Sequence, residues 1–248
     1  MKKINSYQII TLLATVITIT VNALANNLPL NGLNTGEISD RFEIFFVPAG
    51  YVFSIWGLIY LALIVYSIFQ ALPAQANNPV LKKIAPLYWI SSLANTVWIF
   101  LWHYEVFSFT VFAMLTILVT LIMISRLVVG LKGLEKWIVR MTFSIYLGWI
   151  SVATIANVSQ NLYLYQWKGW GLDPQIWAVI LLAVASALGI LKTWMENDTP
   201  YALVLVWAFI GITVSQAGSS LVVTSAWVSV FLLVAALFSS IYKYRKIY

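Results

Sequence analysis

The chain has 248 residues, of which 62% are hydrophobic and 9% are charged. A soluble domain is roughly 45–50% apolar and about 25% charged, so the composition excludes an ordinary soluble enzyme or binding domain. Cysteine is absent, which excludes disulfides, thiol catalysis and thiolate metal sites.

Apolar runs of about 20 residues, the length that crosses a hydrocarbon core, recur along the whole chain. We predict eight membrane-spanning helices, at about residues 6–25, 50–71, 85–103, 107–125, 138–160, 175–193, 200–217 and 223–242. The expected fold class is therefore all-α, an integral membrane helical bundle in contact with the lipid bilayer.

The basic residues predict the orientation of these segments. All but two of the 14 lysines and arginines fall on one side, and the exceptions are Arg41 and Lys168. Since cytoplasmic loops carry the excess of Lys and Arg, we expect an even number of crossings with both termini cytoplasmic. We expect a multi-pass protein of the bacterial inner (plasma) membrane. The net charge of +6 then reflects topology, and we see no nucleic-acid signature in it.

The first segment allows two interpretations. Lys2-Lys3, an apolar stretch and Ala23-Leu24-Ala25 resemble a cleaved signal peptide. However, Thr11, Thr15, Thr18 and Asn22 form a polar stripe at helical spacing, which suits a packed helix better. We therefore expect a retained first helix.

Titratable side chains are missing from the segment interiors, so a proton relay or a charged ion pathway has no support. His103 lies alone at a membrane edge, and Glu196 and Asp198 are expected to be solvated in a short turn. We therefore expect no enzyme activity of a familiar kind and no metal site. The acidic connection at 26–47 is either a lid or a solvated connector.

Two stripes of polar and aromatic residues follow helical spacing within apolar segments. The first contains Tyr88, Ser92, Asn95, Trp98 and Trp102, and the second Tyr146, Trp149, Ala153, Asn157 and Gln160. A buried amide needs a partner, so both stripes should face protein or a ligand. Spacing alone favours helix packing. Seven other tryptophans, Trp167, Trp170 and Trp177 among them, lie near segment ends, where an aromatic belt is expected.

Three motifs carry a resemblance to a known family. Leu87-Tyr88 with Asn95 and Trp98 is similar to the third-helix pattern of the translocator protein (TspO/MBR) family, the tryptophan-rich sensory proteins. Tyr146-Leu147-Gly148-Trp149, followed by Ala153-Thr154 and Asn157, resembles that family's fifth helix at the same spacing. Pro48 to Phe53, with Trp56 and Tyr60, looks like the start of its second helix, although Ala49 and Tyr51 replace a proline and a tryptophan and one residue is missing before Trp56.

The resemblance covers roughly residues 6–161. It implies a TspO/MBR-like five-helix transmembrane region at 1–161, and residues 162–248 are then three additional transmembrane helices and a basic C-terminus. Family members frequently dimerise, so the resemblance also implies a homodimer.

The resemblance further implies a pocket that binds a planar hydrophobic ligand, a tetrapyrrole such as porphyrin or haem, held without a covalent bond for sensing or transport. By this resemblance the ligand-binding residues are Trp56, Tyr60, Asn95, Trp98, Tyr146, Trp149, Ala153 and Asn157. Two alternatives stay open: a small-solute permease that is not coupled through intramembrane charges, and light-dependent degradation of a bound porphyrin.

Overall fold

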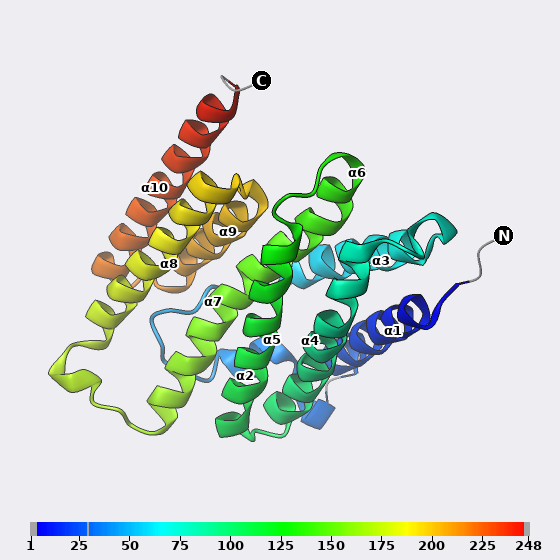
Figure 1. Cartoon of the computed structure of the whole chain (residues 1–248). Helices are drawn as coiled ribbons and strands as arrows, with labels where there is room; N and C mark the ends of the chain where they lie inside the picture. The colour runs from blue at the N-terminus through cyan, green and yellow to red at the C-terminus, as the bar shows by residue number, and fades with distance from the viewer. Residues whose placement is uncertain (1–3, 29, 246–248) are drawn as a thin grey trace. The chain divides into compact units, whose positions relative to one another are not determined.

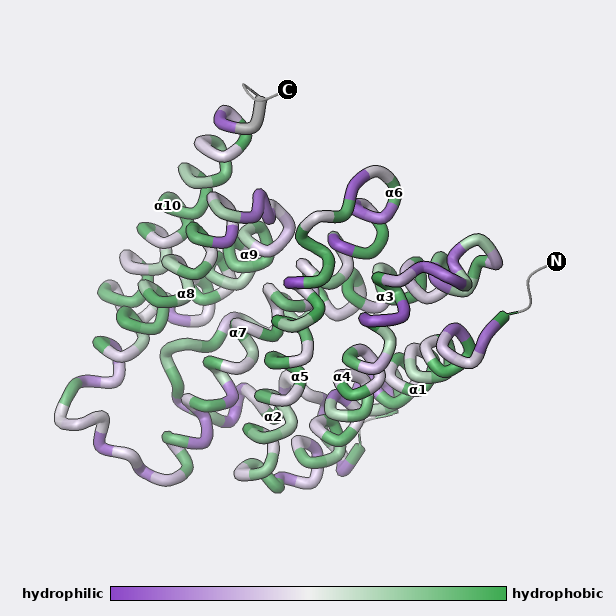
Figure 2. The backbone as a smooth tube through the Cα atoms, in the orientation of Figure 1, coloured by the Kyte–Doolittle hydropathy of each residue, from purple (hydrophilic) through white to green (hydrophobic). Residues whose placement is uncertain are grey.

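The computed structural model describes residues 4–28 and 30–245, and within this part every regular element is a helix. Seven helices are long and apolar enough to cross a membrane, and α9 (Thr199–Ser215) is a shorter apolar helix. These eight confirm the all-α multi-pass membrane fold. Hydrophobic residues run along the helices, and hydrophilic ones gather at connections such as α6 (Gly133–Glu135) (Figures 1 and 2). Lys2, Lys3 and Lys246 of the charge count lie outside the described residues.

The chain forms two compact units. Unit 1 comprises residues 1–41 and 54–150, and unit 2 comprises residues 42–53 and 151–248. The helix α7 (Met141–Leu164) begins in unit 1 and ends in unit 2.

Unit 1 is built from α1 (Ser6–Asn27), α3 (Ile55–Ala71), α4 (Pro79–His103), α5 (Phe107–Val128) and the first part of α7. Short elements connect them: η1 (Leu30–Gly32), α2 (Thr35–Ser39), η3 (Pro73–Gln75), α6, and a π-turn η4 (Lys136–Arg140) that leads into α7. The helices α4 and α5 are neighbours joined by a short turn, and α1 packs on both α3 and α4.

The polar stripe of α1 forms a seam with α3 and α4. Gln8, Thr11, Thr15, Thr18 and Asn22 are all at most 3% exposed. The Gln8 side chain donates to the Gln70 carbonyl oxygen at 2.7 Å, and the Thr11 hydroxyl accepts from the Trp89 indole at 2.9 Å. Because each polar group has a protein partner, the stripe stabilises helix packing inside lipid. The α1 stripe thus packs on α3 and α4, and retention of this segment stays a prediction.

The start of α4 departs from the prediction. The Asn78 side chain accepts hydrogen bonds from the backbone N–H groups of Val80 and Leu81, and Pro79 occupies the first turn. These are the signals of a helix start, so α4 begins six residues before the predicted boundary. Pro86 therefore lies inside a helix and not at its start.

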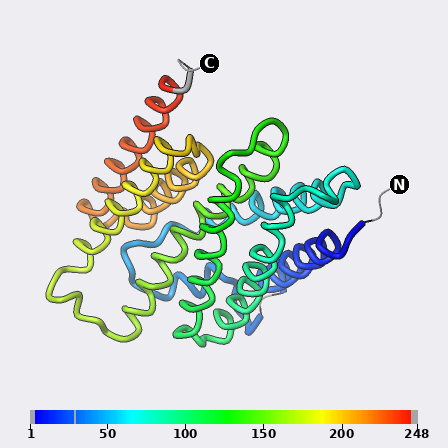
Figure 3. Tube along the Cα trace, viewed as in Figure 1, coloured from blue at the N-terminus to red at the C-terminus, as the bar shows by residue number. Residues whose placement is uncertain are grey.

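Unit 2 contains α8 (Pro174–Glu196), α9 and α10 (Ser220–Arg245), which pack on one another (Figure 3). Side-chain oxygens of Asp173 and Asp198 accept hydrogen bonds from the first turns of α8 and α9, and Pro174 and Pro200 occupy those turns. At Gly189 of α8, an added Cβ would lie 2.6 Å from side-chain atoms of Leu205 and Leu233. This glycine therefore permits close approach of the three helices.

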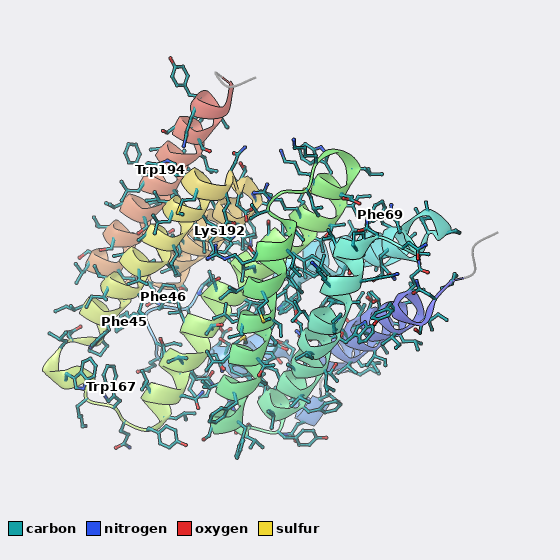
Figure 4. The ribbon with its side chains drawn as sticks, in the orientation of Figure 1. Phe45, Phe46, Phe69, Trp167, Lys192 and Trp194 are labelled. Carbon is teal, nitrogen blue, oxygen red and sulfur yellow. The ribbon has the colours of Figure 1, made fainter. Side chains whose placement is uncertain are left out.

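The segment 42–53, which we call the strap, contains the 3-10 turn η2 (Gly50–Ser54) at its end and lies along α9. The backbone carbonyl oxygens of Val47 and Val52 accept hydrogen bonds from the Ser215 hydroxyl at 2.6 Å and the Trp207 indole at 3.2 Å. Phe46, labelled in Figure 4, is 1% exposed and contacts Phe209 edge to face. Pro48 thus lies in the strap, ahead of the first turn of α3.

The turn between α8 and α9 also corrects an expectation. Glu196 and Asp198 are not solvated, since their side chains are 16% and 2% exposed and both contact the Lys192 ammonium group. The Lys192 Nζ lies 2.9 Å from an Asp198 carboxylate oxygen and 5.4 Å from the centre of the Tyr201 ring. The sequence predicted a solvated turn. In the structure the charged groups of Lys192, Glu196 and Asp198 contact one another and are mostly buried.

Candidate functional site

Four predicted site residues meet in unit 1 as one aromatic cluster. Trp56 and Tyr60 lie one turn apart on α3 and stack, with ring centres 5.4 Å apart. Trp56 also meets Tyr146 and Trp149 of α7 edge to face, at 5.9 and 6.3 Å. Tyr146 and Trp149 are 2% exposed, whereas Trp56 and Tyr60 are half-buried. The cluster Trp56–Tyr60–Tyr146–Trp149 therefore has a closed side on α7 and an accessible side on α3.

Asn95 of α4 joins this cluster through Tyr146. Its side-chain N–H group donates to the Tyr146 hydroxyl at 3.3 Å, and its carbonyl oxygen accepts from the Asn22 amide of α1 at 2.7 Å. All three residues are at most 2% exposed. One amide thus connects α1, α4 and α7. The carbonyl of Asn95 is engaged by protein, so the first stripe contributes to helix packing as well as to the site.

The bond between Asn22 and Asn95 gives a stability prediction. Asn22→Leu removes the donor and leaves the Asn95 carbonyl oxygen buried without it, which should cost about 1–3 kcal/mol of unfolding free energy. The measurement is denaturant unfolding of the purified protein in detergent. Leu13→Ala on α1, where the side chain is 55% exposed, is the matched control and should change stability far less. Equal losses for the two variants would contradict this role of Asn22.

Trp98, the next stripe residue on α4, has different neighbours. Its ring stacks on Trp102 with centres 4.9 Å apart, and the Trp102 indole donates to the Thr35 carbonyl oxygen at 3.2 Å. Trp98 is 7% exposed, and within the described part of the chain its indole N–H has no hydrogen-bond partner. A buried indole donor without a partner is costly, so a ligand acceptor at this position would be stabilised.

The end of α4 is covered by residues 30–41, which include η1 and α2. His103 is 1% exposed, and its Nδ1 lies 3.1 Å from the Leu30 carbonyl oxygen. Its Nε2 lies 3.2 Å from the Thr35 hydroxyl. Nδ1 must therefore donate, and Nε2 accepts in the neutral ring. The acidic connection is thus neither wholly solvated nor a free loop, because its first part is fastened to α4 through this histidine.

The remaining predicted residues, Ala153 and Asn157, lie on the part of α7 that belongs to unit 2. Steps of three and four place them on the same face of α7 as Tyr146 and Trp149. Asn157 is 3% exposed, and its backbone carbonyl oxygen accepts from the Asn161 side chain at 3.0 Å. The structure therefore brings together five of the eight predicted residues around Trp56, with Trp98 next to them on α4.

The chemistry available at the cluster is that of neutral donors and aromatic faces. Phenol, indole and amide groups can orient a ligand, but none supplies a charge. Among residues 4–28 and 30–245, no three histidine, aspartate or glutamate side chains come together as metal ligands. Asn22, which bonds to Asn95, is not among the site residues predicted from sequence. Its position in the α1 stripe was the available signal, but spacing within one helix does not show which helix it faces.

Comparison with known proteins identifies the family. No curated protein and no solved structure matches the chain. A family model described as TSPO-like protein matches residues 8–239, which run from Gln8 in α1 to Ser239 in α10 and so include α8 and α9. The match covers nearly the whole chain and agrees with the resemblance of the third- and fifth-helix motifs. This multi-pass membrane protein belongs to the TSPO-like protein family.

Proposed function

We propose that the protein binds a planar hydrophobic ligand, a tetrapyrrole such as a porphyrin or haem, at the cluster Trp56–Tyr60–Tyr146–Trp149, for sensing or transport. The observation that carries this proposal is the half-buried Trp56 ring, which contacts three other aromatic rings from two helices. Membership of the TSPO-like protein family supports a ligand-binding membrane protein of this kind.

Aromatic faces suit a flat conjugated ligand because tryptophan offers a large apolar surface and stacking adds about 0.5–1.5 kcal/mol beyond burial. Few polar groups are needed to fix its orientation. The unpartnered Trp98 indole N–H supplies one donor on α4.

The residues fit a metal-free porphyrin better than a haem that needs an axial ligand. The one histidine, His103, is held by Leu30 and Thr35 at the end of α4. Stacking, and not iron ligation by histidine, would therefore hold the macrocycle. We expect the affinity to depend on the aromatic rings and to change little between protoporphyrin and its zinc form.

Titration of the purified protein with protoporphyrin tests the proposal. We expect saturable quenching of tryptophan emission together with a shift of the porphyrin absorption band. Trp149→Ala should weaken binding at least tenfold, about 1.4 kcal/mol, because it removes a buried ring of the cluster.

Trp227→Ala is the matched control, since Trp227 of α10 is 51% exposed and lies in unit 2. It should leave the affinity unchanged. Quenching that rises without saturation, or equal affinities of Trp149→Ala and Trp227→Ala, would refute binding at the cluster.

A further inference from the structure

Two tryptophans of the connection between α7 and α8 form one aromatic group with a third tryptophan in the first turn of α8. The ring centres of Trp167, Trp170 and Trp177 lie 5.2–5.6 Å apart in every pair. Trp170 is 81% exposed and Trp167 is 36% exposed. We call this group, Trp167–Trp170–Trp177, the tryptophan knob. It belongs to unit 2, whereas the aromatic cluster Trp56–Tyr60–Tyr146–Trp149 belongs to unit 1.

The knob is held in shape by its own backbone. The Trp177 indole donates to the Gly169 carbonyl oxygen at 2.9 Å, and an added Cβ at Gly169 would lie 3.0 Å from the Trp177 Nε1. Gly169 has a φ of 61°, and Trp170 has a φ of 51°. Residues other than glycine rarely adopt a positive φ. The loop thus uses an unfavourable backbone conformation to present a large apolar ring outward. A mostly exposed apolar ring held in an uncommon backbone conformation indicates a function for that ring.

The flanking helices indicate what covers the knob. α7 ends at Leu164 and α8 begins at Pro174, and both are long and apolar enough to cross the membrane. The loop between them therefore lies at a membrane boundary, at the opposite end of α8 from Lys192 (Figure 4). Tryptophan favours this boundary because its ring is apolar while its N–H can donate to lipid ester groups.

The positive charge of Lys168 also favours the lipid headgroup region as the partner of the knob. Lys168 lies between Trp167 and Trp170, is exposed, and forms no ion pair within the described residues. A lysine beside rings at the bilayer surface can reach lipid phosphate groups. The three rings contact one another, so no space for a small cation remains between them. A partner can therefore contact only the outer surface of the knob.

We propose that the tryptophan knob is a preformed anchor that inserts Trp167 and Trp170 into the lipid headgroup region, with Lys168 on lipid phosphates. It fixes the depth of the α7–α8 connection in the bilayer. This proposal is independent of tetrapyrrole binding, since it concerns a different unit and a different ligand chemistry.

The absence of cysteine makes a site-specific test straightforward. Leu172→Cys places a spin label beside the knob, where the native side chain is 43% exposed. The full chain is reconstituted in vesicles of phosphatidylcholine and phosphatidylglycerol, and the label's accessibility to oxygen and to a water-soluble nickel chelate is measured. Labels at Phe231→Cys, on exposed α10 surface, and Ala74→Cys, in an exposed turn, provide the lipid and water references.

We expect the oxygen accessibility of the label at 172 to lie between those of the two reference labels. Its accessibility to the nickel chelate should be well below that of the label at Ala74. Changing Trp167 and Trp170 together to serine should raise its nickel accessibility to near the Ala74 reference, whereas changing both to phenylalanine should not. Lys168→Gln should raise nickel accessibility in anionic vesicles and not in purely zwitterionic ones.

Three outcomes would overturn the proposal. A label as accessible to nickel in the unaltered loop as at Ala74 would place the knob in water. A label shielded from both oxygen and nickel would show that a protein surface covers it. Unchanged accessibility in the double serine variant would show that the rings do not set the depth. The first two outcomes are measured with the native tryptophans in place, so they remain decisive even if the serine variant folds poorly.

Discussion

Lys192→Met should lower the unfolding free energy by about 3–5 kcal/mol, the cost of removing one partner from a buried charge group. Methionine keeps a long apolar side chain at this position, so the loss of unfolding free energy measures the effect of removing the ammonium group. Without the ammonium group, the carboxylates of Glu196 and Asp198 would face each other with little access to water. The measurement is denaturant unfolding of the purified protein in detergent.

Two further variants make this result interpretable. Lys132→Met removes an exposed lysine and should change stability by less than about 1 kcal/mol. Adding Glu196→Gln and Asp198→Asn to Lys192→Met should recover most of the loss, because no unpaired charge then remains. A loss below about 1 kcal/mol for Lys192→Met alone would mean that water solvates the three charges after all.

Gly211→Ala should destabilise unit 2 by about 1–3 kcal/mol through overpacking. The added Cβ would lie 2.2 Å from a Val52 methyl carbon and 3.0 Å from the Pro48 Cβ, so the strap would have to move away from α9. The hydrogen bonds from Trp207 and Ser215 to strap carbonyls would then lengthen. Denaturant unfolding gives the loss, and emission of Trp207 should shift as its neighbours move.

The steric explanation is tested by a second change in the strap. Val52→Ala removes the clashing methyl group, so Gly211→Ala with Val52→Ala should be more stable than the sum of the single losses predicts, by at least about 0.5 kcal/mol. Gly218→Ala is the control, because no atom lies within 4 Å of its added Cβ. Strictly additive losses would show that contact with Val52 is not the cause.

The membrane-spanning helices could be predicted from sequence because hydrophobic length is a local property. Segments at 107–125 and 175–193 were placed within three residues of α5 and α8. The start of α4 was missed because Lys82 and Lys83 interrupt the apolar run, although Asn78 and Pro79 carry the signals of a helix start. Hydropathy thus shows where a helix is apolar, and capping residues show where it begins.

The site was predictable only in part, for a physical reason. Spacing within α4 and α7 places Asn95 and Tyr146 on defined faces, but it does not state that these two side chains bond to each other or that Asn22 completes the set. The burial of Asp198 likewise depends on contacts between helices. Such pairings are long-range, and a single sequence without aligned relatives carries no direct signal for them.

The division into a five-helix region and three added helices remains a prediction. The two compact units divide the chain at other residues, since unit 2 contains residues 42–53 and 151–248. The strap precedes α3 in sequence yet packs on α9, so residues far apart in sequence share unit 2. The family match also extends through α8 and α9 into α10.

The most direct test of tetrapyrrole binding at the aromatic cluster is the absorption spectrum of the protein purified from cells supplied with a porphyrin precursor. We expect the unaltered chain and Trp227→Ala to retain porphyrin in equal, stoichiometric amounts, and Trp56→Ala and Trp149→Ala to lose most of it. Colourless unaltered protein, or pigment retained equally by all four, would contradict the account.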